Sequence, residues 1–267
     1  MEIKFTIQQF TNLVAIILST FLIGSCNNQP STKTTQTESD SLSYETITLI
    51  NSYQNCEPNT KSCTYISLEY PQFTNVQKPL FDSLSNHINH FIGASPENKI
   101  TEPSDLIETF IQRYASLVEQ DSTYKTPWTL ERTATVYHQN SKQITLQLSE
   151  YSYEGGAHPN SAIQYLLVSK LTGKQLYVND FFDTLSIAKL TMLAEPIFCT
   201  LKGISQSHSM AEAGFDFANN KFALNTNFYF NDAGITFYYN TYEIGPYALG
   251  PTILTIPKYQ VVKLMKK

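Results

Sequence analysis

The sequence predicts an α+β fold of antiparallel sheets with packed helices, arranged as two contiguous subdomains. Tyr and Phe occur 17 and 16 times among the 267 residues, and aromatic residues favour strands. Apolar and polar residues alternate in many short runs, as in strands with one buried face. Longer segments with apolar residues at helical spacing interrupt these runs. The chain is long enough for one large domain or two small ones.

The composition bounds the class of protein. Apolar residues make up 42% of the chain and charged residues 15%, which indicates a globular body. The formal net charge is -5, and no block of basic residues occurs. Proteins that bind nucleic acids need such a block to neutralise phosphates. We therefore expect no nucleic-acid partner.

The first 25 residues are predicted to be a lipoprotein signal peptide. Residues 13–23 form an apolar run of signal-peptide length, too short for a comfortable membrane span. The run ends in Ile23-Gly24-Ser25-Cys26, which resembles the lipobox of bacterial lipoproteins, where the Cys thiol takes the diacylglycerol. Each buried CH₂ of the acyl chains would contribute about 0.8 kcal/mol of membrane binding. The alternative is an ordinary secretory signal in which Cys26 is incidental.

Residues 26–45 are predicted to form a flexible tether. They are polar, rich in Ser and Thr, and without periodicity. At full extension such a segment reaches about 60 Å. We expect a protein of the cell envelope, anchored in a membrane by its N-terminal lipid and facing the periplasm or the exterior. The membrane and the face stay open.

The first predicted subdomain covers residues 46–150. Alternation indicates strands, helical spacing indicates helices, and Pro71 is expected to stop the second strand. Asn140-Ser141 is the expected turn of a hairpin. The predicted elements are strands at 46–53 and 62–70, helices at 78–92 and 104–120, and hairpin strands at 128–139 and 142–153.

Two cysteines of this subdomain are predicted to pair. Cys56 and Cys63 flank the turn between the first two strands, and an exported chain meets oxidising conditions. Closing so small a loop contributes about 2–3 kcal/mol on the chain-entropy model. A metal site is the alternative, but further ligands are lacking nearby. Cys199 falls in a predicted helix and is expected to be a buried free thiol.

The second predicted subdomain covers residues 151–267. Asp180 and Asp183 are interpreted as helix caps, with a catalytic carboxylate pair as the alternative. Pro196 is expected to bend or divide the helix that follows. The predicted elements are a strand at 162–171, a tight turn at 172–174, a helix at 185–202, a hairpin at 227–239, a structured loop at 242–251, a strand at 253–256 and a helix at 259–265.

Several motifs of this subdomain occur in a recognisable order. They are Glu154-Gly-Gly-Ala-His-Pro159, Thr172-Gly-Lys174, Val178-Asn-Asp-Phe-Phe182 and Tyr242-Glu-Ile-Gly-Pro-Tyr-Ala-Leu-Gly250. This order resembles the extracytoplasmic domain of RsiV-type anti-sigma factors, a domain of unknown function that also occurs in bacterial lipoproteins. The preceding subdomain resembles the accessory region of PdaC-type peptidoglycan deacetylases.

The resemblance implies an α+β fold and a role in the cell envelope, and for RsiV it implies binding of lysozyme. RsiV-type proteins carry a sigma-binding segment and a membrane-spanning helix, whereas this sequence begins with a lipoprotein signal. We therefore do not expect an anti-sigma factor. The Thr-Phe-Asp-Asp motif of the deacetylase catalytic domain does not occur in the sequence either.

His158 is the first candidate for chemistry. With Glu154 four residues away, it suggests an acid/base pair or a metal ligand. The alternative is structural: Gly155 and Gly156 shape a turn, and His158 binds a backbone group at the strand entry. His87 and His90 stand at i and i+3 on a helix, but no third metal ligand has suitable spacing, so they are interpreted as histidines at the edge of the core.

Tyrosines near the C-terminal hairpin form the second candidate, an aromatic platform for a sugar or a protein partner. They are Tyr229, Tyr238, Tyr239, Tyr242 and Tyr247, and the alternative is that most cover the core. No nucleophile elbow, phosphate-binding loop or zinc motif occurs in the sequence, so no catalytic residue, metal or cofactor is expected. The residues predicted to bind a ligand are Glu154, Gly155, Gly156, His158, Tyr242 and Tyr247.

These observations predict a non-enzymatic binding lipoprotein tethered in the envelope. Its ligand would be a lysozyme-like hydrolase or peptidoglycan, and the negative net charge suits a basic partner. The alternative is a cell-wall hydrolase or deacetylase that uses His158 and a nearby carboxylate.

Overall fold

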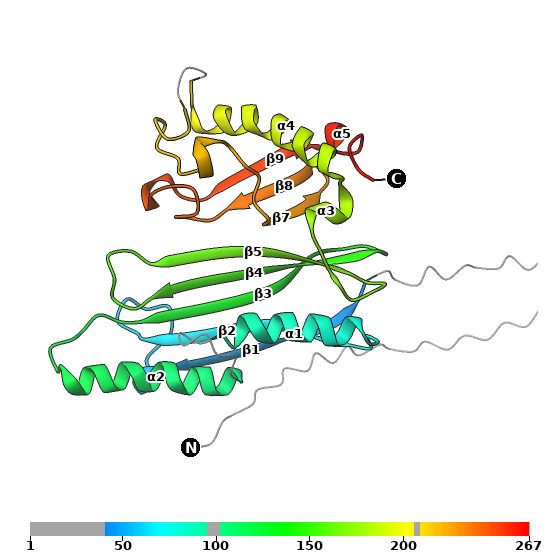
Figure 1. Ribbon diagram of the computed structural model, residues 1–267. Coiled ribbons are helices and arrows are strands. Elements are labelled where there is room, and N and C mark those ends of the chain that lie inside the picture. Colours follow the sequence, from blue (N-terminus) through cyan, green and yellow to red (C-terminus); the bar gives the residue numbers. More distant parts are fainter. Residues whose placement is uncertain (1–40, 95–101, 206–208, 267) are drawn as a thin grey trace, which may run out of the picture. The chain divides into compact units, whose positions relative to one another are not determined.

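The computed structural model describes residues 41–94, 102–205 and 209–266. In these ranges the chain forms five α-helices and nine strands, and the strands make two sheets. Three short 3-10 helices, η1 (Tyr53–Asn55), η2 (Ala218–Asn220) and η3 (Tyr247–Leu249), lie in the connections. The predicted α+β class is confirmed (Figure 1).

The first sheet has six strands in chain order. All neighbours pair antiparallel except the second and third, which pair in parallel. Its strands are β1 (Ser43–Ser52), β2 (Tyr65–Thr74), β3 (Thr129–Gln139), β4 (Gln143–Tyr153), β5 (Asn160–Ser169) and β6 (Gln175–Leu176). The predicted boundary between residues 150 and 151 falls inside β4.

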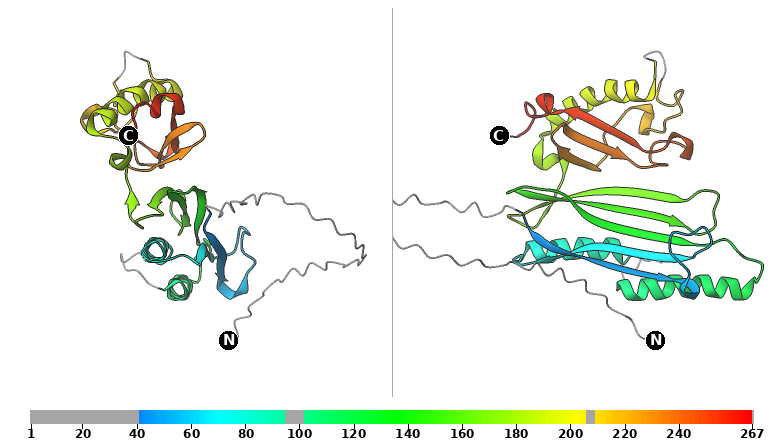
Figure 2. Two further views of the ribbon diagram at one scale, coloured as in Figure 1. Left: turned by 90° about the vertical axis from the view of Figure 1, so that its right-hand side faces the viewer. Right: turned by 180° about the vertical axis from the view of Figure 1, so that it is seen from behind.

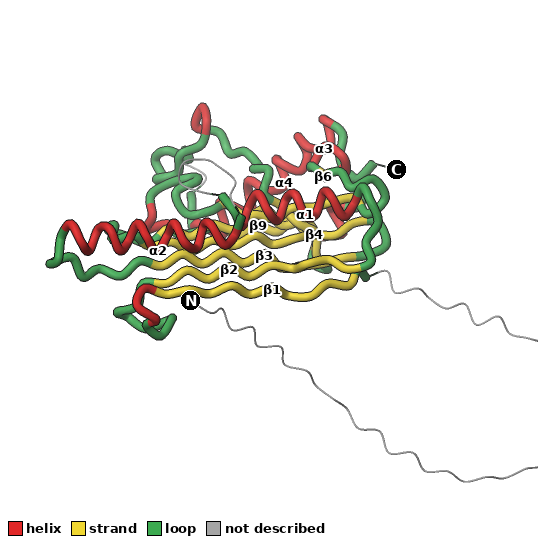
Figure 3. The backbone as a smooth tube through the Cα atoms, turned by 90° about the horizontal axis from the view of Figure 1, so that it is seen from below, coloured by secondary structure: helices red, strands yellow, loops and turns green. Residues whose placement is uncertain are grey.

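Two helices connect the parallel pair β2 and β3, as a crossover between parallel strands requires. They are α1 (Leu80–Ile92) and α2 (Pro103–Gln120). Both lie on the same face of the sheet (Figure 2), and in Figure 3 they run along strands β1 to β4. Leu84 and Ile88 of α1 and Phe110 of α2 are buried in the core between helices and sheet.

The prediction that Pro71 ends the second strand is wrong, because β2 continues to Thr74. The Tyr65 amide donates to the Trp128 carbonyl on the side of β3, so alternation places the Pro71 nitrogen on that side too. Pairing between β2 and β3 ends at Glu69. A strand tolerates proline where no ladder hydrogen bond is needed from its nitrogen.

The second sheet has three antiparallel strands, β7 (Phe228–Asn231), β8 (Gly234–Tyr239) and β9 (Thr252–Pro257). The short helix α3 (Val178–Phe181) and the long helix α4 (Thr184–Lys202) precede it, and α5 (Lys258–Val261) follows it. Helix α4 contacts β9 and buries Leu190, Ala194 and Phe198 in the core. Helix α5 is shorter than the terminal helix that the sequence predicts at 259–265.

Helix α4 begins at a cap that the sequence predicts. Asp183 accepts a hydrogen bond from the Ser186 amide at 2.7 Å, and this bond holds the pKa of its carboxyl below the usual value. Asp180 likewise accepts from the Tyr177 amide at 2.7 Å, so both aspartates cap helices. Pro196 does not divide α4, which runs through it. Within the described part of the chain, α4 alone is long and apolar enough to cross a membrane by length and composition.

The predicted disulfide between Cys56 and Cys63 is confirmed. It closes the loop between β1 and β2, just after η1. Cys199 is free as predicted, but it is half-buried and not fully enclosed. The signal peptide at 1–25, Cys26 and most of the tether lie outside the described residues, while Ser43 to Glu45 of the predicted tether already belong to β1.

Candidate functional site

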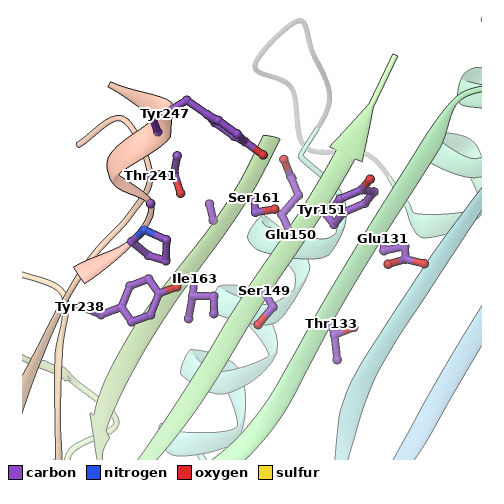
Figure 4. A pocket seen from close by; sticks show the side chains of 14 residues that line it. Glu131, Thr133, Ser149, Glu150, Tyr151, Ser161, Ile163, Tyr238, Thr241 and Tyr247 are labelled. Carbon is purple, nitrogen blue, oxygen red and sulfur yellow. The ribbon is translucent and has the colours of Figure 1, made fainter. Parts of the chain in front are cut away.

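An open groove lies where strands β3, β4 and β5 of the first sheet meet the loop between β8 and β9 (Figure 4). Its volume is about 560 Å³. Side chains from both sheets line it: Glu131, Thr133, Ser149, Glu150, Tyr151, Ser161, Ala162, Ile163, Tyr238, Thr241, Tyr247, Ala248, Gly250 and Pro251.

Strand alternation builds the floor of this groove. Side chains two residues apart share one face of a strand, and the registers of β3, β4 and β5 bring them side by side. Glu131 lies opposite Tyr151, and Tyr151 lies opposite Ser161. Thr133, Ser149 and Ile163 form the next row. The side chains that alternate with these on the strands, such as Leu130 and Leu148, point to the other face of the sheet and belong to the buried core with α1 and α2.

The loop from Thr241 to Pro251 forms the opposite wall. Its start is fixed by Glu243, whose carboxylate accepts from the Asn240 amide at 2.7 Å. Tyr242 has a φ of 69° and Gly250 a φ of 60°, both in the left-handed region. These two turns bracket η3, which carries Tyr247 into the groove. The wall is therefore a turned loop with defined hydrogen bonds.

Three rings join this loop to the loop before β5. The imidazole of His158 stacks on Tyr247, with ring centroids 4.4 Å apart and planes inclined by 10°. Tyr242 contacts the same tyrosine at 5.5 Å. His158 and Tyr242 are exposed, and Tyr247 is half-buried. Three of the predicted binding residues thus come together. In the described structure His158 makes this ring contact in place of the backbone hydrogen bond that the structural alternative expected.

The possible acid/base pair of His158 and Glu154 does not form in the described structure. The Glu154 carboxylate accepts from the Arg113 guanidinium of α2 at 3.1 Å. Glu154 lines a small hollow between α2 and the first sheet, whose other lining residues include Arg113 and Leu106. Arg113 of α2 lies next to the Glu154 side chain, whereas the His158 ring lies beyond the turn, stacked on Tyr247.

Of the two adjacent glycines, only Gly155 has a backbone conformation that requires glycine. Gly155 has a φ of +89°, and a Cβ placed there would lie 2.5 Å from the Tyr124 hydroxyl. Gly156 has no such φ, and a Cβ there would meet only the His158 carbonyl oxygen, at 3.7 Å. The double glycine therefore shapes the approach to His158 mainly through Gly155.

The two glutamates of the groove have different surroundings. Glu150 accepts from the Arg132 guanidinium at 2.7 Å, and Arg132 is nearly buried. Glu131 accepts a hydrogen bond from the Tyr65 hydroxyl through its Oε1. Burial, with this bond and the nearby charge of Glu131, raises the pKa of Tyr65. Among the described residues no cation lies within ion-pair distance of Glu131.

The predicted platform is smaller than the sequence suggested. Tyr229, Tyr238 and Tyr239 are buried, with Tyr239 only 1% exposed. Tyr229 and Tyr238 pack with Tyr165 between the two sheets, and the Tyr239 hydroxyl donates to the Ala223 carbonyl at 2.7 Å. They belong to the interior, although an edge of Tyr238 reaches the groove. Tyr242 and Tyr247 remain as the accessible rings.

Of the two helical histidines, His87 matches its interpretation as a histidine at the edge of the core, whereas His90 does not. His87 is half-buried, and burial followed by the charge of His90 lowers its pKa. His90 is exposed, with Nδ1 2.9 Å from the Asn86 carbonyl oxygen. In the described ranges no group of three or more His, Cys, Asp or Glu side chains is placed to hold a metal ion.

Sequence reasoning missed the polar floor. Glu131, Thr133 and Ser149 fall in predicted strands and Ser161 directly precedes one, but none of the four is predicted to belong to a site. The available signal was their alternation with buried apolar residues on three strands, which shows that one face of this sheet is polar. The register that aligns these residues depends on pairings between strands, and the sequence of one strand does not contain it.

Two family models match parts of the chain. Residues 57–161 match the model of a family described as "Deacetylase PdaC". Residues 179–259 match the model of a "Protein of unknown function (DUF3298)". No curated protein matches the sequence. Both parts of the predicted family resemblance are confirmed at this level, while its RsiV-type naming stays a prediction.

Two solved structures share the fold. One is a DUF3298 family member from Bacteroides fragilis, with 20% sequence identity, a TM-score of 0.65, and coverage of 85% of this chain and 94% of that chain. The other is a DUF3298 family protein from Pseudomonas aeruginosa, with 17% identity, a TM-score of 0.60, and coverage of 85% and 95%. The groove of this chain is lined by residues of both matched regions, among them Glu131 of the first and Tyr247 of the second.

Proposed function

Because the chain joins a PdaC-type region to a DUF3298 region, we propose that it is a non-enzymatic binding lipoprotein tethered in the cell envelope. The ligand is peptidoglycan or a lysozyme-like protein, held in the groove between β3–β5 and the Thr241–Pro251 loop. The observation that carries the proposal is this groove, with Tyr247 at its wall and the exposed rings of His158 and Tyr242 packed against that tyrosine.

The groove suits recognition of a ligand by contact. Accessible aromatic rings supply large contact area at low conformational cost, and hydroxyl and carboxylate groups beside them fix orientation. The groove contains both kinds of group on one surface. General acid/base catalysis requires partners within hydrogen-bond reach of each other. The engagement of Glu154 by Arg113 supports binding over the hydrolase or deacetylase alternative.

The test is a binding assay on the full-length protein purified from membranes. It is incubated separately with purified peptidoglycan sacculi and with lysozyme, and co-sedimentation or co-purification is measured. We expect binding to one of the two, and we expect Tyr247→Ala to weaken it at least about tenfold, because interface aromatics are the residues whose truncation costs most. Tyr259→Ala is the matched control, since Tyr259 is 64% exposed on α5 and does not line the groove.

Binding to neither ligand would refute the proposal. The same incubation is examined for released sugars or acetate by mass spectrometry, and release that His158→Ala abolishes would establish the enzymatic alternative instead. Anchoring is tested separately: a Cys26→Ser variant should leave the membrane fraction, because the lipid would lose its attachment atom. Retention of this variant in membranes would contradict lipid anchoring.

A further inference from the structure

We propose that the groove recognises a glycan whose sugar ring carries a free amino group, with the ammonium at Glu131 and the face of the sugar on Tyr151. This inference rests on the proposed function, because it names the chemical class of ligand for the same groove. It is carried by the register of the floor, the hydrogen-bond and ion-pair partners of its carboxylates, and the positions of its hydroxyl groups.

The register places a ring and a carboxylate side by side. Glu131 of β3 and Tyr151 of β4 are direct cross-strand partners on the groove face. The Cβ atoms of such partners lie about 4.5–5.5 Å apart. Tyr151 is 38% exposed, so its ring is accessible. A sugar ring that covers Tyr151 therefore brings a ring substituent to Glu131 (Figure 4).

Of the two glutamates in the groove, Glu131 is the one whose carboxylate can bind a cation. Glu150 is already paired with Arg132. Glu131 uses Oε1 to accept the Tyr65 hydroxyl, which fixes its position, and its Oε2 has no hydrogen-bond or ion-pair partner among the described residues. A half-buried carboxylate of this kind favours a charged donor, and charge-assisted hydrogen bonds are about twice as strong as neutral ones.

The other residues that line the groove favour a ligand with several hydroxyl groups. None of the lining residues is Lys, Arg or His, so the groove offers no counter-charge for phosphate or carboxylate groups. Hydroxyl groups of Thr133, Ser149 and Ser161 surround Tyr151 on the same face. Several hydroxyls beside one ring match a ligand with several hydroxyls of its own. A lysine side chain of a protein would satisfy Glu131 but would leave these groups unused.

The test compares two oligosaccharides of equal length, glucosamine oligomers and N-acetylglucosamine oligomers, by titration calorimetry with the full-length protein. The pH is held below the pKa of the sugar amine. We expect the glucosamine oligomer to bind about tenfold tighter, because a hydrogen bond to a charged group contributes at least that factor. The preference should shrink as salt is raised, since the attraction is partly screened.

Variants assign the preference to residues. Glu131→Gln keeps an acceptor for the Tyr65 hydroxyl and removes the charge, so it should fold normally and bring the ratio of the two affinities close to one. Tyr151→Ala should weaken both oligomers. Glu119→Gln is the control, because it makes the same charge change at an exposed position of α2. Unchanged thermal unfolding of Glu131→Gln shows that the fold is intact.

The outcomes separate this inference from the proposed function. Equal binding of both oligomers, unaffected by Glu131→Gln, overturns the inference and leaves the proposed function standing. Binding of lysozyme that depends on Glu131, without binding of either oligomer, also overturns it, because the cation would then come from a protein. If no oligomer, no sacculus and no lysozyme binds, both proposals fail.

Discussion

The two adjacent glycines of the loop before β5 differ in whether their backbone requires glycine. Gly155 has a backbone conformation that L-residues rarely adopt and lies against Tyr124, while Gly156 has neither constraint. Gly155→Ala should destabilise the protein by about 1–2 kcal/mol, because a Cβ is strained in the left-handed region and meets the Tyr124 hydroxyl. Urea denaturation followed by circular dichroism measures this change.

Gly156→Ala is the matched control for that measurement. We expect its free energy of unfolding to stay within about 0.5 kcal/mol of the natural protein, as for surface substitutions away from special features. Equal effects of the two substitutions would show that the Gly155 backbone is not the constraint. The Tyr124 hydroxyl also accepts from the Trp128 indole at 2.9 Å, so a displaced Tyr124 should change tryptophan fluorescence in Gly155→Ala alone.

Two ion pairs near the site differ in what they do. Arg132 is nearly buried, and besides Glu150 it donates to the carbonyl oxygens of Ile92 and Ala94, so it ties α1 to the sheet. Arg113 and Glu154 are both 37% exposed, and exposed pairs contribute little to stability. The consequence of the second pair is positional: it turns Glu154 towards α2.

Among the elements, the disulfide-closed loop after β1 is the clearest case for a quantitative prediction. Its two cysteines are 7 residues apart in sequence. Replacing both with Ser should lower the free energy of unfolding by about 2–3 kcal/mol, because the unfolded chain gains conformational freedom. Chemical denaturation of the oxidised protein and of the double variant gives the difference.

The natural protein treated with reductant is the companion measurement, and it should approach the double variant. A double variant as stable as the oxidised protein would show that the bridge does not limit the unfolded chain. None of the residues that line the groove belongs to this loop.

At the scale of the whole described molecule, two asparagines join the second sheet to the first. Asn227 accepts from the Tyr165 amide and donates to the Ile163 carbonyl, both at 2.7 Å. Asn240 accepts from the Ile163 amide, also at 2.7 Å. Strand β5 pairs with β6 only at Leu167 and Val168, so these side chains bind backbone groups that a longer neighbouring strand would otherwise pair.

Asn227→Ala should therefore uncouple the two sheets. We expect a loss of about 2 kcal/mol, because two hydrogen bonds of about 1 kcal/mol each disappear. The sole tryptophan, Trp128, lies in the core of the first sheet, so its fluorescence reports on that part, while circular dichroism reports on the whole. The two unfolding midpoints should separate in this variant.

Asn225→Ala is the control for uncoupling. The Asn225 amide donates to the Tyr238 carbonyl and to Glu243, and so stays within the second part of the fold. This variant should lose stability while the two midpoints move together. Coincident midpoints in Asn227→Ala would show instead that Asn240 and the tyrosine layer of Tyr165, Tyr229 and Tyr238 keep the sheets coupled without Asn227.

Most elements could be predicted from local patterns because each pattern depends on neighbouring residues. Alternation located the strands of the β3–β4 hairpin, and Asn140 accepts from the Lys142 and Gln143 amides at its turn as a turn asparagine does. Pro71 was misjudged because its tolerance depends on where pairing with β3 ends. Whether Tyr229 and Tyr239 belong to the platform or to the core stayed open, because a hairpin pattern does not say whether a second layer covers it.

The residues of the candidate site could likewise be predicted only in part. The sequence indicated His158, Tyr242 and Tyr247 separately, through a glycine turn and an aromatic loop, but it could not predict that their rings meet. It suggested Glu154 as a possible partner of His158 because they are close in sequence, whereas the fold places Arg113 next to Glu154. It gave no reason to select Glu131, whose neighbours Tyr65 and Tyr151 come from other strands.

The sequence by itself determined the α+β class, the order of the elements, the Cys56–Cys63 bridge and the helix caps, because each follows from interactions between residues a few positions apart. Tertiary structure alone decided which polar side chains share the groove and which tyrosines are buried. Those outcomes depend on strand register and on the packing of one sheet against another, which join residues far apart in the chain.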